Sequence, residues 1–137
     1  MYLKKYNLKN KYALITGAGK GLGKACAIAL AEAGANVIII SRTNKDLSTV
    51  SKKIKKFRVK CRSYTCDVTN YNEVKNVIDQ IPRIDILVNN AGIGFVGNIE
   101  QTEERDFDRL YQVNVKGVFN CIKAILVIGR NFIFLLT

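Results

Sequence analysis

The chain has 137 residues, of which 48% are hydrophobic and only one is proline, and this is the length and composition of a single globular domain. Its formal net charge is +11 and it contains no histidine, so Ser-His and Cys-His nucleophiles are excluded. Four cysteines, at positions 26, 61, 66 and 121, form no C-x-x-C pair, and we expect buried thiols and no metal site.

The distribution of basic and apolar residues indicates which partners and which cellular location to expect. Basic residues crowd into positions 45–62, but an apolar stripe runs through the same segment and no aromatic residues are interleaved for base stacking, so we expect a solvated helix face and no nucleic-acid partner. The apolar stretches 124–129 and 131–137 are far shorter than the about 20 residues of a membrane span. Charges interrupt the first eleven residues, where a signal peptide needs an apolar run. We therefore expect a cytoplasmic protein with no membrane partner.

A glycine-rich loop follows the first predicted strand, residues 11–16. Glycines at every second position from 17 to 23 let the backbone turn sharply and approach a diphosphate, and the next helix offers unpaired N–H groups and a positive dipole end. That helix ends at Gly34, and its predicted apolar stripe consists of Leu22, Ala25, Cys26, Ala29, Leu30 and Ala33. The pattern predicts a phosphate-binding strand–loop–helix unit, and a plain tight turn is the alternative.

The second predicted strand, 36–40, is a β-branched run that ends at Ser41-Arg42-Thr43. An acidic residue at this turn would bind the ribose 2′-hydroxyl of NAD, whereas an arginine accommodates the 2′-phosphate of NADP. Arg42 holds the position, and Lys20 in the glycine loop adds a second positive charge. The pair indicates NADP, with two unrelated surface cations as the alternative.

Further strands and helices alternate along the rest of the chain. We predict a helix capped by Asn44, a third strand at 59–66 that leads into Asp67-Val68, and a helix whose capping box is Asn70 with Glu73. The buried face of that helix is predicted to be Val74, Val77, Ile78 and Ile81. A fourth strand, 84–89, leads into the tetrad Asn89, Asn90, Ala91 and Gly92.

One long helix is predicted from an N-cap at Thr102 to about residue 125. Its predicted lining is Phe107, Leu110, Val113, Val118, Cys121, Ile122 and Ile125. Asn114 lies in the middle of this helix, and because asparagine is a poor helix former, its presence there needs an explanation. Residues 132–136 are a candidate fifth strand. The alternation predicts an α/β fold in one domain, 1–137: a Rossmann-type doubly wound parallel sheet, incomplete at the C-terminus.

Taken together, T-G-x-x-x-G-x-G at 16–23, Asp67-Val68, the Asn-Asn-Ala-Gly tetrad and V-N-V-K-G-V-F at 113–119 resemble the short-chain dehydrogenase/reductase family over about residues 8–125. The overall pattern is most similar to 3-oxoacyl-acyl-carrier-protein reductases. The resemblance implies hydride transfer between NADPH and a small-molecule carbonyl or alcohol, in a homo-oligomer. Asn114 would be catalytic by holding a water of the proton relay. The implied cofactor contacts are Thr16, Gly17, Gly19, Lys20, Gly21, Leu22, Gly23, Arg42, Asp67, Val68, Asn89, Asn90, Ala91 and Gly92.

The resemblance ends before the family's catalytic serine and Tyr-x-x-x-Lys pair, which follow a fifth strand. Tyr71 and Lys75 have the spacing of that pair, but they follow the third strand, on the adenine side of a doubly wound site, and we do not expect them to be catalytic. An inactive nucleotide-binding module or a truncated gene fragment is therefore the alternative to an active oxidoreductase.

Overall fold

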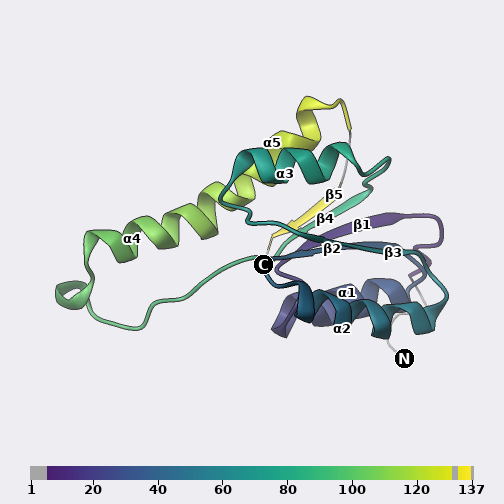
Figure 1. Ribbon diagram of the computed structural model, residues 1–137, viewed down its shortest axis with the longest axis horizontal. Helices are drawn as coiled ribbons and strands as arrows, with labels where there is room; N and C mark the ends of the chain where they lie inside the picture. The colour runs from purple at the N-terminus through teal and green to yellow at the C-terminus, as the bar shows by residue number, and fades with distance from the viewer. Residues whose placement is uncertain (1–5, 131–132, 137) are drawn as a thin grey trace.

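The computed structural model describes residues 6–130 and 133–136, and its centre is a five-stranded parallel sheet (Figure 1). The strand order is β3-β2-β1-β4-β5. The strands are β1 (Tyr12–Thr16), β2 (Asn36–Ser41), β3 (Cys61–Thr65), β4 (Ile86–Asn89) and β5 (Ile133–Leu136). The chain moves outward from β1 to β3 and then returns to the other side of β1, so the order reverses between β1 and β4. The predicted doubly wound sheet is confirmed, and ligands of such sheets bind at this reversal.

Helices cover both faces of the sheet. Helices α1 (Gly21–Glu32) and α2 (Asn44–Ile54) lie on one face, and α3 (Tyr71–Asp79) and α5 (Gly117–Val127) lie on the other (Figure 1). Successive residues of β1 lie on opposite faces of the sheet. Leu14 belongs to the core cluster on the side of α3 and α5, whereas Ala13 and Ile15 belong to the cluster on the side of α1 and α2. This two-sided burial explains why the strand sequences are continuous apolar runs.

The predicted faces of α2 and α3 are largely confirmed. The apolar stripe predicted within residues 45–62 consists of Leu47, Val50, Ile54 and Phe57. The first three are buried in α2, whereas Phe57, in a short 3-10 turn (η1, Lys55–Phe57), is 38% exposed. On α3 the predicted stripe is buried, and the side chain of Asn70 accepts hydrogen bonds from the N–H groups of Asn72 and Glu73. The predicted capping box is only half formed, because the Glu73 carboxylate accepts from the N–H of Asp67 and not from that of Asn70. Asn44 is the first residue of α2 and not its cap, because Thr43 holds the N-cap position.

The predicted buried face of α1 is largely wrong, although Leu30 packs against the core. The helix buries Gly23, Ala27 and Ala31, while Leu22 is 73% exposed. Small side chains at every fourth position let the helix axis approach the sheet closely, so the close contact does not involve the larger residues. Periodicity alone predicts a stripe one residue away from the buried one, through Leu22, Cys26 and Leu30 instead of Gly23, Ala27 and Ala31.

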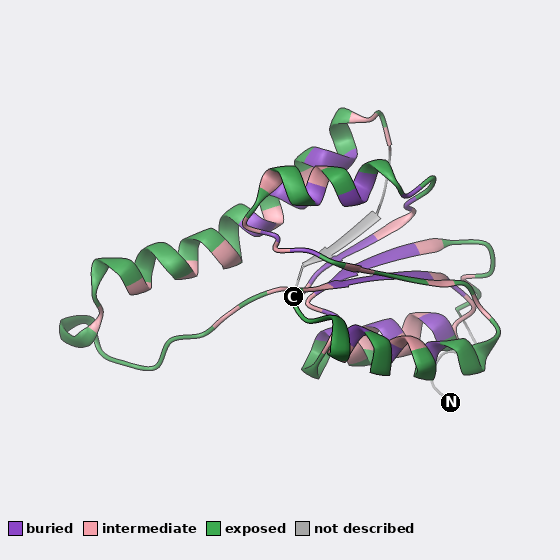
Figure 2. Cartoon of the chain, in the orientation of Figure 1, coloured by how far each residue is buried: buried purple, intermediate pink, exposed green. Residues whose placement is uncertain are grey.

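The predicted long helix is three segments. It starts one residue later than predicted, as α4 (Glu104–Tyr111) with Glu103 as N-cap, continues through a π-helical turn η3 (Gln112–Lys116), and ends as α5. A short 3-10 turn, η2 (Ile99–Gln101), precedes it. α4 extends away from the sheet and has no buried residue (Figure 2). Phe107, assigned to the buried face, is 63% exposed, whereas Cys121 and Ile125 of α5 are buried.

The remaining findings concern β3, the candidate fifth strand, the cysteines and membrane spans. β3 is shorter than the predicted 59–66, and the candidate fifth strand is confirmed at 133–136, paired in parallel with β4, while residue 132 lies outside the described residues. Cys66 and Cys121 are buried as expected, but Cys26 and Cys61 are partly exposed. Within the described residues, no helix is long and apolar enough to cross a membrane.

Candidate cofactor site

The glycine loop turns at the carboxyl end of β1, beside the end of β4. Gly17 has φ +63°, and a Cβ there would lie 2.8 Å from the Cα atom of Ala91. A Cβ on Gly23, in the first turn of α1, would overlap both the carbonyl oxygen of Gly17 and the side-chain nitrogen of Asn90. These two positions therefore require glycine, because loop, helix and neighbouring strand end are in contact.

Thr16 and Asn90 join the glycine loop to the end of β4. The hydroxyl oxygen of Thr16 accepts hydrogen bonds from the N–H groups of Asn90 (3.1 Å) and Ala91 (3.0 Å). In return, the Asn90 amide donates to the carbonyl oxygens of Thr16 and Gly17, both at 3.1 Å. The two strand ends at the reversal of strand order are thus held in one geometry, and Asn89 beside them is buried.

The N-terminus of α1 has the features of an anion site. Lys20 holds the N-cap position without a side-chain capping hydrogen bond, and the first turn carries no acidic residue. By contrast, Asn70 caps α3, and Glu73 lies in its first turn. The first N–H groups of α1 are therefore available to a ligand, and the helix dipole favours a negatively charged one.

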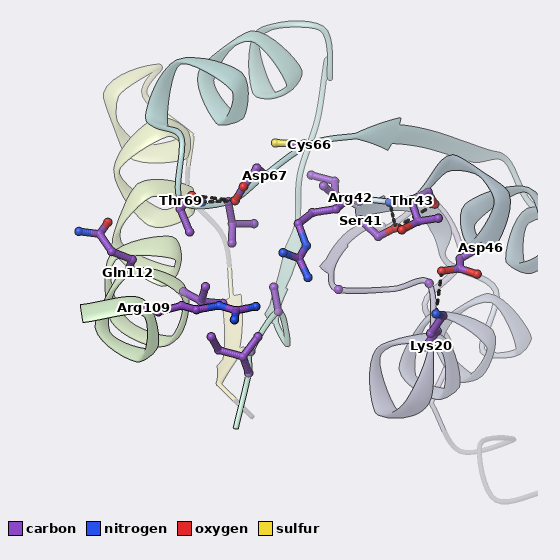
Figure 3. Close-up of a pocket in the computed structure, with 18 residues that line it drawn as sticks. Lys20, Ser41, Arg42, Thr43, Asp46, Cys66, Asp67, Thr69, Arg109 and Gln112 are labelled. Atoms are coloured by element: carbon purple, nitrogen blue, oxygen red, sulfur yellow. Dashed lines mark hydrogen bonds and ion pairs between the residues drawn. The ribbon is translucent and has the colours of Figure 1, made fainter. Parts of the chain in front are cut away.

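A pocket of about 520 Å³ opens at this edge of the sheet (Figure 3). Its walls come from the glycine loop, the ends of β2, β3 and β4, and the junction of α4 with η3. Of the predicted contacts it brings together Gly17, Gly19, Lys20, Arg42, Asp67, Val68, Ala91 and Gly92. Lys20 does not face the pocket as a free charge, since its ammonium nitrogen lies 3.4 Å from a carboxylate oxygen of Asp46.

The end of β3 is held in place from two directions. Asp67 accepts hydrogen bonds from the N–H group (2.9 Å) and the hydroxyl (2.8 Å) of Thr69. The buried Asn120 of α5 donates to the carbonyl oxygen of Val68 at 2.8 Å, and a Cβ on Gly117 would lie 2.7 Å from the Val68 side chain. Sequence reasoning missed Asn120 and Gly117, and the available signal was a polar residue and a glycine inside the apolar face of a helix.

A buried thiol completes this wall. Cys66 lines the pocket, and burial, with the nearby charges of Glu73 and Asp67, raises its pKa to about 12. Cys66 is therefore a neutral thiol at physiological pH and no nucleophile.

A smaller cavity of about 380 Å³ shares the lining residues 91–93 with the large pocket. Leu22, Asn114 and Val118 line it together with residues 89–93. The Asn114 side chain is occupied by the loop after β4: its oxygen accepts from the N–H of Ile93 and its nitrogen donates to the carbonyl of Ile93, both at 2.9 Å. The predicted catalytic residue thus joins the π-helical turn to that loop, and its catalytic role stays a prediction.

Tyr71 and Lys75 line neither of these two pockets. Tyr71 packs at the edge of the core, where the Lys123 ammonium lies 5.1 Å from its ring centre. Lys75 is paired with Asp79 at 2.6 Å. The pair therefore lies away from both pockets, and its lack of a catalytic role stays a prediction.

The geometry agrees with the comparisons to known proteins. The short chain dehydrogenase family model matches residues 11–128, and the chain belongs to this family. An uncharacterised oxidoreductase of Thermotoga maritima is 44% identical over 115 residues, which are 82% of this chain and 46% of that protein. The 3-oxoacyl-acyl-carrier-protein reductase FabG of the same organism is 36% identical over 123 residues, 87% of this chain and 50% of that protein. The chain spans about half the length of the curated relatives it matches.

Solved structures show the same fold with either nicotinamide cofactor. A gluconate 5-dehydrogenase from Burkholderia cenocepacia, in complex with NADP and tartrate, superposes with a TM-score of 0.84 at 33% identity, covering 98% of this chain and 56% of that one. A carveol dehydrogenase from Mycobacterium avium, in complex with NAD, has a TM-score of 0.86 at 27% identity, covering 96% and 55%. The family binds nicotinamide cofactors, and the neighbours include complexes with each of them.

Proposed function

We propose that this chain is the cofactor-binding part of an NADP-dependent oxidoreductase that transfers hydride between NADPH and a carbonyl group. The observation that carries the cofactor choice is at the end of β2, where Arg42 lines the large pocket in the place that an acidic residue would need to bind a ribose 2′-hydroxyl. The neighbours with bound NADP and NAD show that the fold itself does not decide between the two.

The residues present fit such a cofactor. The uncapped N-terminus of α1 would hold the diphosphate, Arg42 the 2′-phosphate, and Asp67 with Val68 the adenosine end. The cavity beside Leu22, Asn90 and Asn114 would take the nicotinamide end, and the Thr16–Asn90 hydrogen bonds keep the two pockets in fixed relation. When bound, the cofactor supplies the hydride. The chain's own part is to bind and orient it.

The proposed substrate class follows from the relatives. FabG is named for 3-oxoacyl thioesters attached to acyl-carrier protein, and the solved neighbours are named for small alcohols and sugar acids. We propose a small-molecule carbonyl or alcohol substrate, with a 3-oxoacyl thioester as the first to test.

Titration of NADPH and NADH by calorimetry tests the cofactor choice. A charge-assisted contact contributes about 1.5–3 kcal/mol, so NADPH should bind roughly ten to a hundredfold more tightly, and Arg42→Asp should remove the preference. Arg58→Asp is the matched control, because Arg58 has φ +60°, which aspartate tolerates, and does not line the pocket. Equal affinities for the two cofactors, or a preference that survives Arg42→Asp, would refute the proposal.

A second candidate function is cofactor binding without turnover by these 137 residues alone. It is supported by the lining of the smaller cavity, whose described residues include no serine, tyrosine or lysine that could donate a proton to a carbonyl. NADPH oxidation should then stay at the background rate with 3-oxoacyl thioesters and ketones, although NADPH binds. Turnover that Tyr71→Phe abolishes would contradict the placement of Tyr71 outside the site.

A further inference from the structure

Two guanidinium groups enter the large pocket from opposite walls. Arg42 follows β2, and Arg109 lies in the last turn of α4. Figure 3 shows both side chains extended into the space between these walls. Arg109 was not among the residues that the sequence assigned to the cofactor.

The other charged side chains of the pocket already have partners in the chain, although the partner of Asp67 is neutral. Asp46 is paired with Lys20, and Asp67 accepts two hydrogen bonds from Thr69. Within the part of the chain that the structure describes, no ion pair or hydrogen bond engages the side chain of Arg42 or Arg109. Arg105, one turn earlier on α4, lies 2.6 Å from a carboxylate oxygen of Glu103.

The charged side chains that line the pocket are three basic ones, Lys20, Arg42 and Arg109, and two acidic ones, Asp46 and Asp67. The lining therefore has a net positive charge, which favours an anionic ligand between the two arginines. A phosphate dianion suits the site, because each guanidinium can donate two parallel hydrogen bonds to its oxygens. Burial does not explain where Arg109 points, since α4 has no buried residue.

We propose that Arg109 is a second ligand of the adenosine 2′-phosphate, opposite Arg42, and so determines cofactor specificity. The proposal rests on the NADP dependence proposed above and adds a specificity residue on α4, a helix outside the glycine loop and the β2 turn. Stacking of Arg109 on the adenine ring is the competing arrangement, and it would favour NADPH and NADH equally.

The test compares Arg109→Gln with Arg105→Gln, which removes a neighbouring arginine of the same helix that does not line the pocket. Affinities for NADPH and NADH, and for the fragments 2′,5′-ADP and 5′-AMP, are measured by calorimetry, with circular dichroism as the check on folding. We expect Arg109→Gln to weaken NADPH and 2′,5′-ADP about tenfold or more and to leave NADH and 5′-AMP nearly unchanged. Arg109→Lys should recover part of the loss, and Arg105→Gln should have no effect.

The outcomes separate this inference from the proposed function. If the unsubstituted chain does not prefer NADPH, the cofactor proposal fails and the role of Arg109 fails with it. If the preference is present and Arg42→Asp abolishes it while Arg109→Gln retains it, only the role of Arg109 is overturned. If Arg109→Gln weakens the affinity for all four ligands equally, Arg109 stacks on the adenine ring, and its proposed role at the 2′-phosphate is overturned.

Discussion

Gly23 is the residue where helix α1, the glycine loop and the β4 end meet. In an ordinary helix, alanine in place of glycine stabilises by about 1 kcal/mol. Here the added Cβ would overlap the Gly17 carbonyl oxygen and the Asn90 side chain, and overpacking of this kind costs about 1–3 kcal/mol. Gly23→Ala should therefore lower the free energy of unfolding in urea and weaken NADPH binding.

Gly94→Ala is the control for this prediction. Gly94 has no positive φ, and a Cβ there would meet nothing within 4 Å. Its free energy of unfolding should change by less than about 0.5 kcal/mol. A Gly23→Ala variant as stable as Gly94→Ala would show that α1 does not approach the loop as closely as described.

The buried thiols of Cys66 and Cys121 predict a loss of stability at alkaline pH. Burial raises the pKa of each from 9.0 to about 12, so between pH 9 and pH 12 the unfolded chain releases these protons and the folded chain retains them. The thiol contribution is complete below pH 9 and falls as pH rises, by up to about 1.4 kcal/mol per pH unit for each thiol.

Urea unfolding at pH 8, 9 and 10 measures this slope. Cys121→Ala should make the decline of unfolding free energy with pH less steep, although the variant is less stable at every pH. Cys26→Ala, at a partly exposed position, is the comparison. The prediction fails if Cys121→Ala leaves the slope of the unsubstituted chain unchanged.

At the scale of elements, the π-helical turn η3 is joined to the loop after β4 through Asn114. Its side chain makes two hydrogen bonds to the backbone of Ile93, and π-helical turns are frequent at functional sites. Asn114→Ala removes both bonds, and the exchange of the Ile93 amide hydrogen should become faster by about fivefold or more.

Asn90 provides the contrast for this measurement. The Asn90 side chain donates hydrogen bonds to the glycine loop and makes none to Ile93 or Asn114. Asn90→Ala should therefore leave the hydrogen exchange of the Ile93 amide as slow as in the unsubstituted chain. Unchanged Ile93 exchange in Asn114→Ala would mean that the loop is held by other contacts, and it would leave the π-helical turn without this function.

At the scale of the whole molecule, an apolar stripe runs along the projecting helix. Phe107, Tyr111, Val115 and Phe119 recur every fourth residue, and each is about half exposed or more. Exposed apolar surface of this kind favours association, so the 137-residue chain should self-associate at micromolar concentration in sedimentation velocity. The family resemblance leads to the same expectation, a homo-oligomer.

The double variant Phe107→Gln with Tyr111→Gln should shift the chain toward monomer. Val96→Gln with Ile99→Gln is the matched control, since both residues are exposed and precede the stripe. A monodisperse, cooperatively unfolding monomer of the unsubstituted chain would contradict the prediction.

Local sequence patterns were enough to predict the type and order of the main elements and the motifs at the strand ends. Strands such as 36–40 are apolar on both faces, and the capping of α3 by Asn70 depends on residues within one turn, so local sequence is sufficient for both. Parallel strands all end at one edge of the sheet. The glycine loop, Arg42, Asp67 and the tetrad were therefore expected to meet there.

The contacts that these groups make became visible in the folded chain alone. There α1 packs through Gly23, Ala27 and Ala31, Lys20 pairs with Asp46, and Arg109 of α4 faces the same pocket as Arg42. The physical reason is that periodicity records spacing along one element. How closely two elements approach, and at what angle, depends on the volumes of side chains whose residues lie far apart in the sequence.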